Sequence, residues 1–158
     1  MREIKEIIIH CSDTQEGVNV TAADIRRWHT TPKEKGGRGW RDIGYHYVIG
    51  ITGMIEIGRP IEQRGAHCIG RHGEDHNSHS IGICYIGGRH VNPDDSWSWA
   101  DTRTEAQKEA MIALLRMLKK CFPKATIHGH NEFADRVCPC FDVQAWLKEL
   151  RENNEIDF

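Results

Sequence analysis

The chain has 158 residues, of which 39% are hydrophobic and 28% charged, and its net charge is −2 at pH 7. This length suits one domain whose core buries roughly 70% of the surface of the unfolded chain. The composition is that of an ordinary globular protein. The charge balance lacks the basic excess that favours nucleic acid, so we expect no nucleic-acid partner. No apolar run approaches the roughly 20 residues of a membrane span, so we expect no membrane insertion.

The N-terminus, MREIKEIIIHCSD, has an apolar stretch of only Ile7 to Ile9, which Glu6 precedes. A secretory signal needs a longer apolar region and a small-residue cleavage site. We therefore expect synthesis in the cytoplasm, with release or export by another route if the substrate lies outside the cell. In that compartment the six cysteines are expected to be reduced thiols. A monomer is the default expectation.

The first half of the chain alternates strand and helix signals. The isoleucine run in residues 3–10 predicts a buried strand. Thr21 and Asp24 form a capping-box variant at the start of a helix over 21–30. Further expected segments are an exposed loop at 31–42 and two strands, 45–51 and 54–59, joined by a turn at Thr52-Gly53.

The second half contains the clearest helix, expected over 104–122, where apolar residues recur at helical spacing. Asp142 can cap a last helix that continues to about residue 153. The remaining segments are expected to be a long loop at 60–79, a strand at 80–86, a polar loop at 89–103 and a short strand at 125–128.

The mixed order of strands and helices predicts an α/β fold. We expect a single domain over residues 1–158, with a central mixed sheet of about five strands and helices packed on its faces. The loops at 31–42, 60–79 and 87–103 are longer than most connections, which often marks a binding surface.

Histidine and cysteine residues near predicted strand ends suggest a metal site. His130 and Cys138 are separated by seven residues in the segment IHGHNEFADRVCPCFD, and His10 ends the first predicted strand. Zinc accepts imidazole and thiolate ligands, and three protein ligands with one open position are typical of a catalytic site. Alternatively, His10 is a hydrogen-bonded strand-end residue and Cys138 a buried thiol. Cys140 is a competing ligand, whereas strand alternation should turn Cys11 toward the core.

A second histidine group occurs in RHGEDHNSHS, residues 71–80, at positions 72, 76 and 79. Helical spacing would align His72 with His76 as a second metal site. Gly73 and the polarity of the segment favour instead a solvated loop, near the substrate cleft that the family resemblance described next implies.

Four segments together carry a family resemblance. They are IIIHCSDT at 7–14, DIGYHYVIG at 42–50, GAHCIGRHGEDHNSHSIGICYIGG at 65–88 and HGHNEFADRVCPCFD at 128–142. In this order they resemble the N-acetylmuramoyl-L-alanine amidase family, which includes small phage amidases and the peptidoglycan recognition proteins. The resemblance implies zinc bound by His10, His130 and Cys138. It also implies cleavage of the bond between N-acetylmuramic acid and L-alanine in peptidoglycan.

The resemblance also assigns roles to single residues. Tyr45 matches the catalytic tyrosine, whose phenol can hydrogen-bond an oxyanion; otherwise it is a core aromatic. His67 matches a histidine that lines the substrate cleft; otherwise it is a solvent-exposed loop residue. Arg136 replaces a lysine of the phage enzymes, so it keeps the positive charge but cannot carry a proton. Asn77 and Ser80 are interpreted as hydrogen bonders that fix a loop.

Two other functions fit the same residues. A thiol amidase would use Cys138 as nucleophile and His130 as base. A peptidoglycan-binding or regulatory module would show no turnover, although Tyr45 together with Cys138 favours an enzyme. Trp40, Trp97 and Trp99 lie in predicted loops, where they can line the substrate site or be partly buried.

Overall fold

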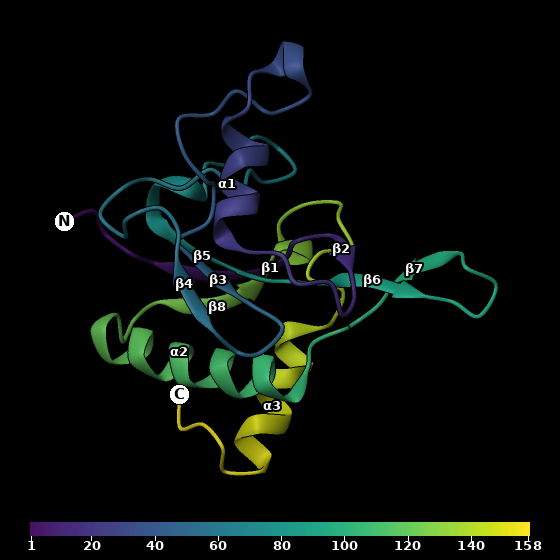
Figure 1. The fold of residues 1–158 in the computed structure, drawn as a ribbon. Helices are drawn as coiled ribbons and strands as arrows, with labels where there is room; N and C mark the ends of the chain where they lie inside the picture. Colours follow the sequence, from purple (N-terminus) through teal and green to yellow (C-terminus); the bar gives the residue numbers. More distant parts are fainter.

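A five-stranded mixed sheet forms the centre of the protein in the computed structural model, which describes residues 1–158 (Figure 1). Its strands are β1 (Glu6–Cys11), β3 (Tyr47–Ile49), β4 (Ile55–Ile57), β5 (Ser80–Tyr85) and β8 (Thr126–Gly129). The strand order is β4-β3-β5-β1-β8, with β4 as the antiparallel edge strand and the other neighbours parallel. The predicted α/β fold with about five strands is therefore confirmed.

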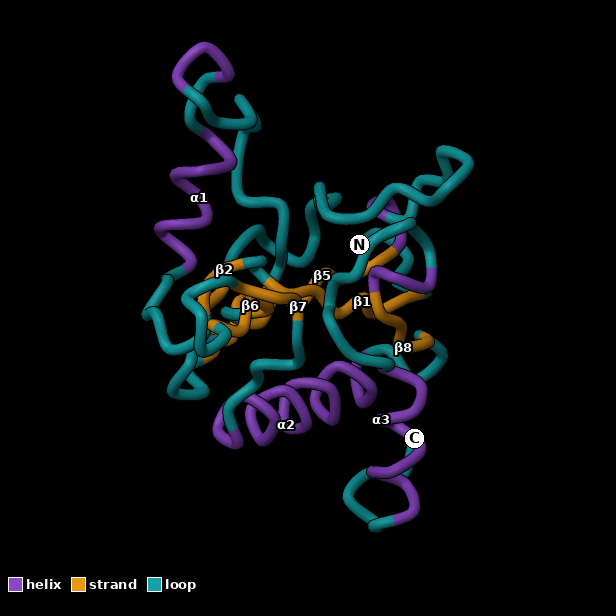
Figure 2. Tube along the Cα trace, turned by 90° about the vertical axis from the view of Figure 1, so that its right-hand side faces the viewer, coloured by secondary structure: helices purple, strands orange, loops and turns teal.

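Helices cover both faces of this sheet. They are α1 (Ala22–Thr30), α2 (Glu105–Cys121) and α3 (Val143–Glu152). Figure 2 shows α1 on one side of the sheet and α2 with α3 on the other. Ile7 and Ile9 of β1 belong to the main core, on the α2 and α3 side. Because side chains alternate along a strand, Glu6, Ile8 and His10 point to the opposite face.

The helix starts follow the capping residues seen in the sequence. The Thr21 hydroxyl accepts a hydrogen bond from the Asp24 amide, and the Thr21 amide donates to the Asp24 carboxylate. This reciprocal pair satisfies amide groups that the first helical turn leaves unpaired. Asp142 caps α3 by accepting from the Ala145 amide at 3.0 Å. Both predicted helix starts are confirmed.

No helix of the structure has the length and apolar character needed to cross a bilayer.

The prediction of a polar loop over residues 89–103 is wrong for the first part of this segment, which forms a β-hairpin. Strands β6 (Gly88–Val91) and β7 (Trp97–Trp99) pair antiparallel, and β2 (Thr14–Gln15) completes a separate three-stranded sheet. The hairpin projects from the domain beside β2 (Figure 1). Trp97 and Trp99 are 45% and 53% exposed. The alternation in Ser96-Trp97-Ser98-Trp99 is a strand signal, but it is only four residues long and both faces of β7 are exposed.

Candidate metal centre and cleft

Three separate elements bring His10, His130 and Cys138 together. His10 is near the end of β1, His130 begins a short 3-10 helix directly after β8, and Cys138 lies in the loop before α3. Because β1 and β8 are parallel neighbours, their carboxyl ends lie at the same edge of the sheet. The possible ligand atoms of the three residues all lie within 4.8 Å of one another. The trio singled out in the sequence is therefore one spatial group.

The Cys138 loop is held by hydrogen bonds to the sheet. The Cys11 amide donates to Cys138 Sγ at 3.3 Å, and the Tyr85 hydroxyl donates to the Pro139 carbonyl at 2.6 Å. The competing ligand Cys140 instead faces Cys11, with 3.7 Å between the two sulfur atoms. Cys11 is buried in the main core, as predicted. Cys138 is thus the cysteine that reaches the two histidines.

His67 links the site to the neighbouring strand. His67 Nδ1 lies 2.9 Å from His10 Nε2, and His67 Nε2 lies 3.1 Å from the Ser80 hydroxyl. The Asn77 side-chain oxygen accepts from two successive amides, beginning with that of His67 at 2.7 Å. Asn77 and Ser80 therefore fix this loop, as predicted. The contact between His67 and His10 has no signal in the sequence.

A glycine makes room for the His67 ring. Gly82 of β5 lies beneath it, and a Cβ at this position would be 2.7 Å from two ring carbons. Carbon atoms in van der Waals contact are about 3.5–4.0 Å apart. The close approach of strand and imidazole therefore requires a residue without a side chain.

The imidazoles of the site are kept neutral. Burial, followed by the neighbouring His67 and His130, lowers the pKa of His10 well below its ordinary value. Burial and the Arg136 guanidinium lower the pKa of His130 to about 4. Burial also lowers the pKa of His67. Neutral imidazole is the form that binds a metal ion.

The thiol of the site is protonated in the absence of a cation. The adjacent Cys11 thiol and burial raise the pKa of Cys138. Cys138 Sγ lies 3.7 Å from Nδ1 of His10, and no hydrogen bond joins it to His130. A thiol nucleophile instead needs a lowered pKa and a base within hydrogen-bond reach. The predicted Cys138–His130 nucleophile–base pair is therefore not supported by the geometry.

The donor set fits zinc. Two neutral imidazoles and one sulfur, supplied by three elements, match a tetrahedral centre with one position left for water or substrate. A raised thiol pKa does not oppose this, because coordination to a divalent ion deprotonates a thiol.

The buried His10 adjoins His130 and Cys138, which line a cleft of about 920 Å³. The Tyr45 ring lines it, with its centroid 5.1 Å from that of His10. Burial raises the pKa of Tyr45, so its phenol stays protonated and can donate a hydrogen bond. The exposed Arg136 also lines the cleft. Of the residues assigned to the site from the sequence, Tyr45, His67, His130, Arg136 and Cys138 line this cavity, and His10 is buried directly behind them.

Aromatic residues form the walls of the cleft. Trp40 and Trp99 line it, whereas Trp97 lies under the Arg89 guanidinium outside it. Trp28 of α1 is a further lining residue that sequence reasoning missed, since it was counted only as part of a helix. Its 41% exposure is unusual for so large an apolar side chain and fits a substrate wall.

Comparison with known proteins places this arrangement in a family. Residues 1–141 match the family described as N-acetylmuramoyl-L-alanine amidase. The chain is 36% identical to an endolysin of Enterobacteria phage K11 over 149 residues, covering 93% of this chain and 87% of the relative. It is 35% identical to the endolysin of Escherichia phage T7 over 150 residues, covering 95% and 87%. The chain belongs to the N-acetylmuramoyl-L-alanine amidase family and is a peptidoglycan amidase.

Solved structures agree with this assignment. The fold is similar to that of the amidase LysC from Clostridium intestinale, with a TM-score of 0.70, 24% identity and coverage of 99% of this chain and 88% of the other. Drosophila PGRP-LB gives a TM-score of 0.70 at 26% identity, covering 93% and 81%. The resemblance inferred from the four sequence segments is confirmed.

Proposed function

We propose that the protein is a zinc-dependent hydrolase that cleaves the amide bond between N-acetylmuramic acid and L-alanine in peptidoglycan. His10, His130 and Cys138 hold the ion. The observation that carries the proposal is that their ligand atoms lie within 4.8 Å of one another, with His130 and Cys138 lining the cleft. Zinc, when bound, acts as a Lewis acid that polarises a carbonyl and lowers the pKa of water toward about 7.

Tyr45 and Arg136 stabilise charge during the reaction. The Tyr45 phenol is a protonated donor beside His10, so it hydrogen-bonds the oxygen on which negative charge develops. Arg136 has no acidic partner in the structure and lies on the exposed side of the same cleft. Its guanidinium adds positive charge, but it stays protonated and transfers no proton.

His67 positions His10 as well as lining the cleft. With Nδ1 of His10 turned toward Cys138, Nε2 carries the proton and donates to Nδ1 of His67. Nε2–H of His67 then donates to the Ser80 hydroxyl. With these tautomers, His67 fixes the orientation of the His10 ring. Hydrogen bonds from residues outside the coordination sphere commonly orient metal-binding histidines in this way.

Peptidoglycan enters along the aromatic walls. Trp28, Trp40 and Trp99 offer flat apolar surfaces for sugar rings or stem peptide. The relatives called endolysins support action on the cell wall after release from the cell in which the chain is made. We propose that the monomer is the acting form, because all the site residues come from one chain.

Digestion of purified peptidoglycan, with and without a chelator, tests the proposal. We expect mass spectrometry to detect released peptides that begin with L-alanine. Chelation should abolish their release and added zinc should restore it. Disaccharides with intact stems as the only products would refute the bond assignment. Activity that persists in excess chelator but is lost on alkylation would favour a thiol amidase.

A further inference from the structure

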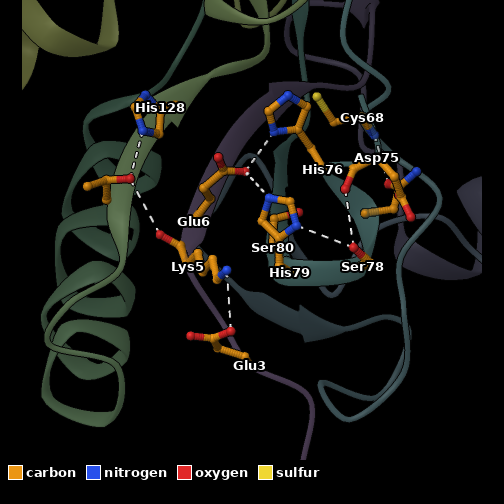
Figure 3. Close-up of polar contacts among 12 residues, drawn as sticks. Glu3, Lys5, Glu6, Cys68, Asp75, His76, Ser78, His79, Ser80 and His128 are labelled. Atoms are coloured by element: carbon orange, nitrogen blue, oxygen red, sulfur yellow. Dashed lines mark hydrogen bonds and ion pairs between the residues drawn. The ribbon is translucent and has the colours of Figure 1, made fainter. Parts of the chain in front are cut away.

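A second group of metal-binding side chains lies on the same face of β1 as His10. Glu6, at the start of this strand, meets His76 and His79 from the turn that precedes β5 (Figure 3). Glu6 Oε2 is 2.8 Å from His76 Nδ1 and 3.3 Å from His79 Nε2. Ile8 separates Glu6 from His10 along this face. The expectation of a solvated loop at 71–80 is therefore wrong for His76 and His79.

The two imidazoles are held in place by groups outside the cluster. The His76 ring stacks on Phe133, with 4.0 Å between centroids and 25° between planes. The carbonyl of His79 accepts from the Lys5 amide at 2.8 Å, which ties the turn to β1. Arg2 donates to the carbonyls of the two residues between the histidines. A ligand arriving here meets donors that are already oriented, so little ordering is needed on binding.

The charge at this point also favours a cation. The Glu6 side chain is only 16% exposed, and its carboxylate contacts His76 and His79 rather than any lysine or arginine. A poorly hydrated carboxylate is costly unless it is paired or coordinates a metal. The His76 and His79 side chains are 13% and 31% exposed, which leaves one side of the cluster open to solvent.

We propose that Glu6, His76 and His79 form a second site for a divalent transition-metal ion, distinct from the His10–His130–Cys138 centre. The ligand atoms of the trio lie within 4.8 Å of one another. Two imidazoles and a carboxylate are a donor set that zinc accepts, and imidazole also suits nickel and copper. An ion bound here joins β1 to the turn whose Asn77 fixes His67.

Zinc stoichiometry measured by equilibrium dialysis and metal analysis tests this proposal. Wild-type protein should bind two ions. Glu6→Gln and His76→Gln should each bind one ion and retain amidase activity. His72→Ala changes a histidine of the same loop outside the cluster and should still bind two. Circular dichroism melts confirm that each variant is folded, and Glu6→Gln preserves the side-chain shape.

The Cys138→Ser variant separates the two sites. Cys138→Ser should still bind one ion, and the double variant that also carries Glu6→Gln should bind none. This result would support the second site independently of whether the first site is needed for activity. Equal zinc content in wild type, Glu6→Gln and His76→Gln would overturn the proposal. So would a Cys138→Ser protein whose zinc content is unaffected by Glu6→Gln.

Discussion

The two ends of one face of β1 carry histidine clusters that differ in what surrounds them. At the carboxyl end, His10 is 1% exposed and adjoins the Cys138 sulfur and the Tyr45 phenol beside the cleft. At the amino end a carboxylate, that of Glu6, stands in place of the sulfur, and no member of this group lines the cleft that His130 and Cys138 line. Metal-binding residue types therefore do not by themselves define a catalytic site. The aromatic walls and the nearby hydrogen-bond donor Tyr45 distinguish the end at which we propose the reaction takes place.

Among the changes considered, replacing the Cys138 sulfur should lower amidase activity the most. Cys138→Ser removes a ligand of the proposed zinc site, so we expect peptidoglycan hydrolysis to fall to background. Cys140→Ser is the matched control, because its sulfur faces Cys11 rather than His10. It should retain both zinc and turnover. Equal loss of activity in both variants would contradict a specific role for Cys138.

Removing the phenol should have the next largest effect. Tyr45→Phe keeps the ring but deletes the donor, so kcat should fall about 10²–10³-fold while zinc content stays unchanged. Tyr47→Phe removes a hydroxyl from the same strand region, and Tyr47 packs against the main core on the opposite face. This control should be nearly as active as wild type. A Tyr45→Phe enzyme with normal kcat would exclude oxyanion stabilisation by this residue.

Loss of the positioning histidine should act mainly on metal binding. His67→Ala frees Nε2 of His10, and zinc affinity should weaken by about 10–100-fold. Ser80→Ala removes only the outer hydrogen bond, so its effect should be smaller. Competition with a chromogenic chelator measures both affinities. If His67→Ala raises KM without changing zinc affinity, His67 acts on the substrate alone.

Acidification should produce a gradual loss of stability in metal-free protein. Burial is the main cause that lowers the pKa of His29, His46 and His130 to about 4. An unfolded histidine titrates near 6.5, so between pH 6.5 and 4 the unfolded chain binds more protons. The free energy of unfolding should therefore decline as the pH falls through this window. Urea denaturation at several pH values measures it, and a flat profile would contradict neutral buried histidines.

Much of the fold follows from local patterns in the sequence. The apolar spacing of α2, the Thr21 and Asp142 caps and the isoleucines of β1 each specify an element, because local preference and burial agree there. The hairpin of β6 and β7 could not be predicted in the same way. It lies outside the core, so no long apolar pattern marks its two short strands, and the pairing of β6 with β2 joins residues far apart in the chain.

The candidate metal centre could be predicted only where its residues lie in segments that match the family. His10, His130 and Cys138 could be named because their segments match the amidase pattern, whereas spacing alone left Cys140 as a competitor. The His10–His67 contact depends on how the loop before β5 folds, which no local pattern reports. Glu6 did carry a signal, since a carboxylate alternating with Ile8 and His10 on a buried strand needs a partner.

Gly82 has a practical consequence for protein engineering. Stabilisation campaigns commonly replace glycine by alanine inside regular structure, where the added methyl restricts the unfolded chain. On β5 the same change would place a carbon where the His67 ring lies and displace the imidazole that steadies His10. Variants that carry Gly82→Ala should therefore lose activity, although Gly82 lies behind His67 and does not line the cleft.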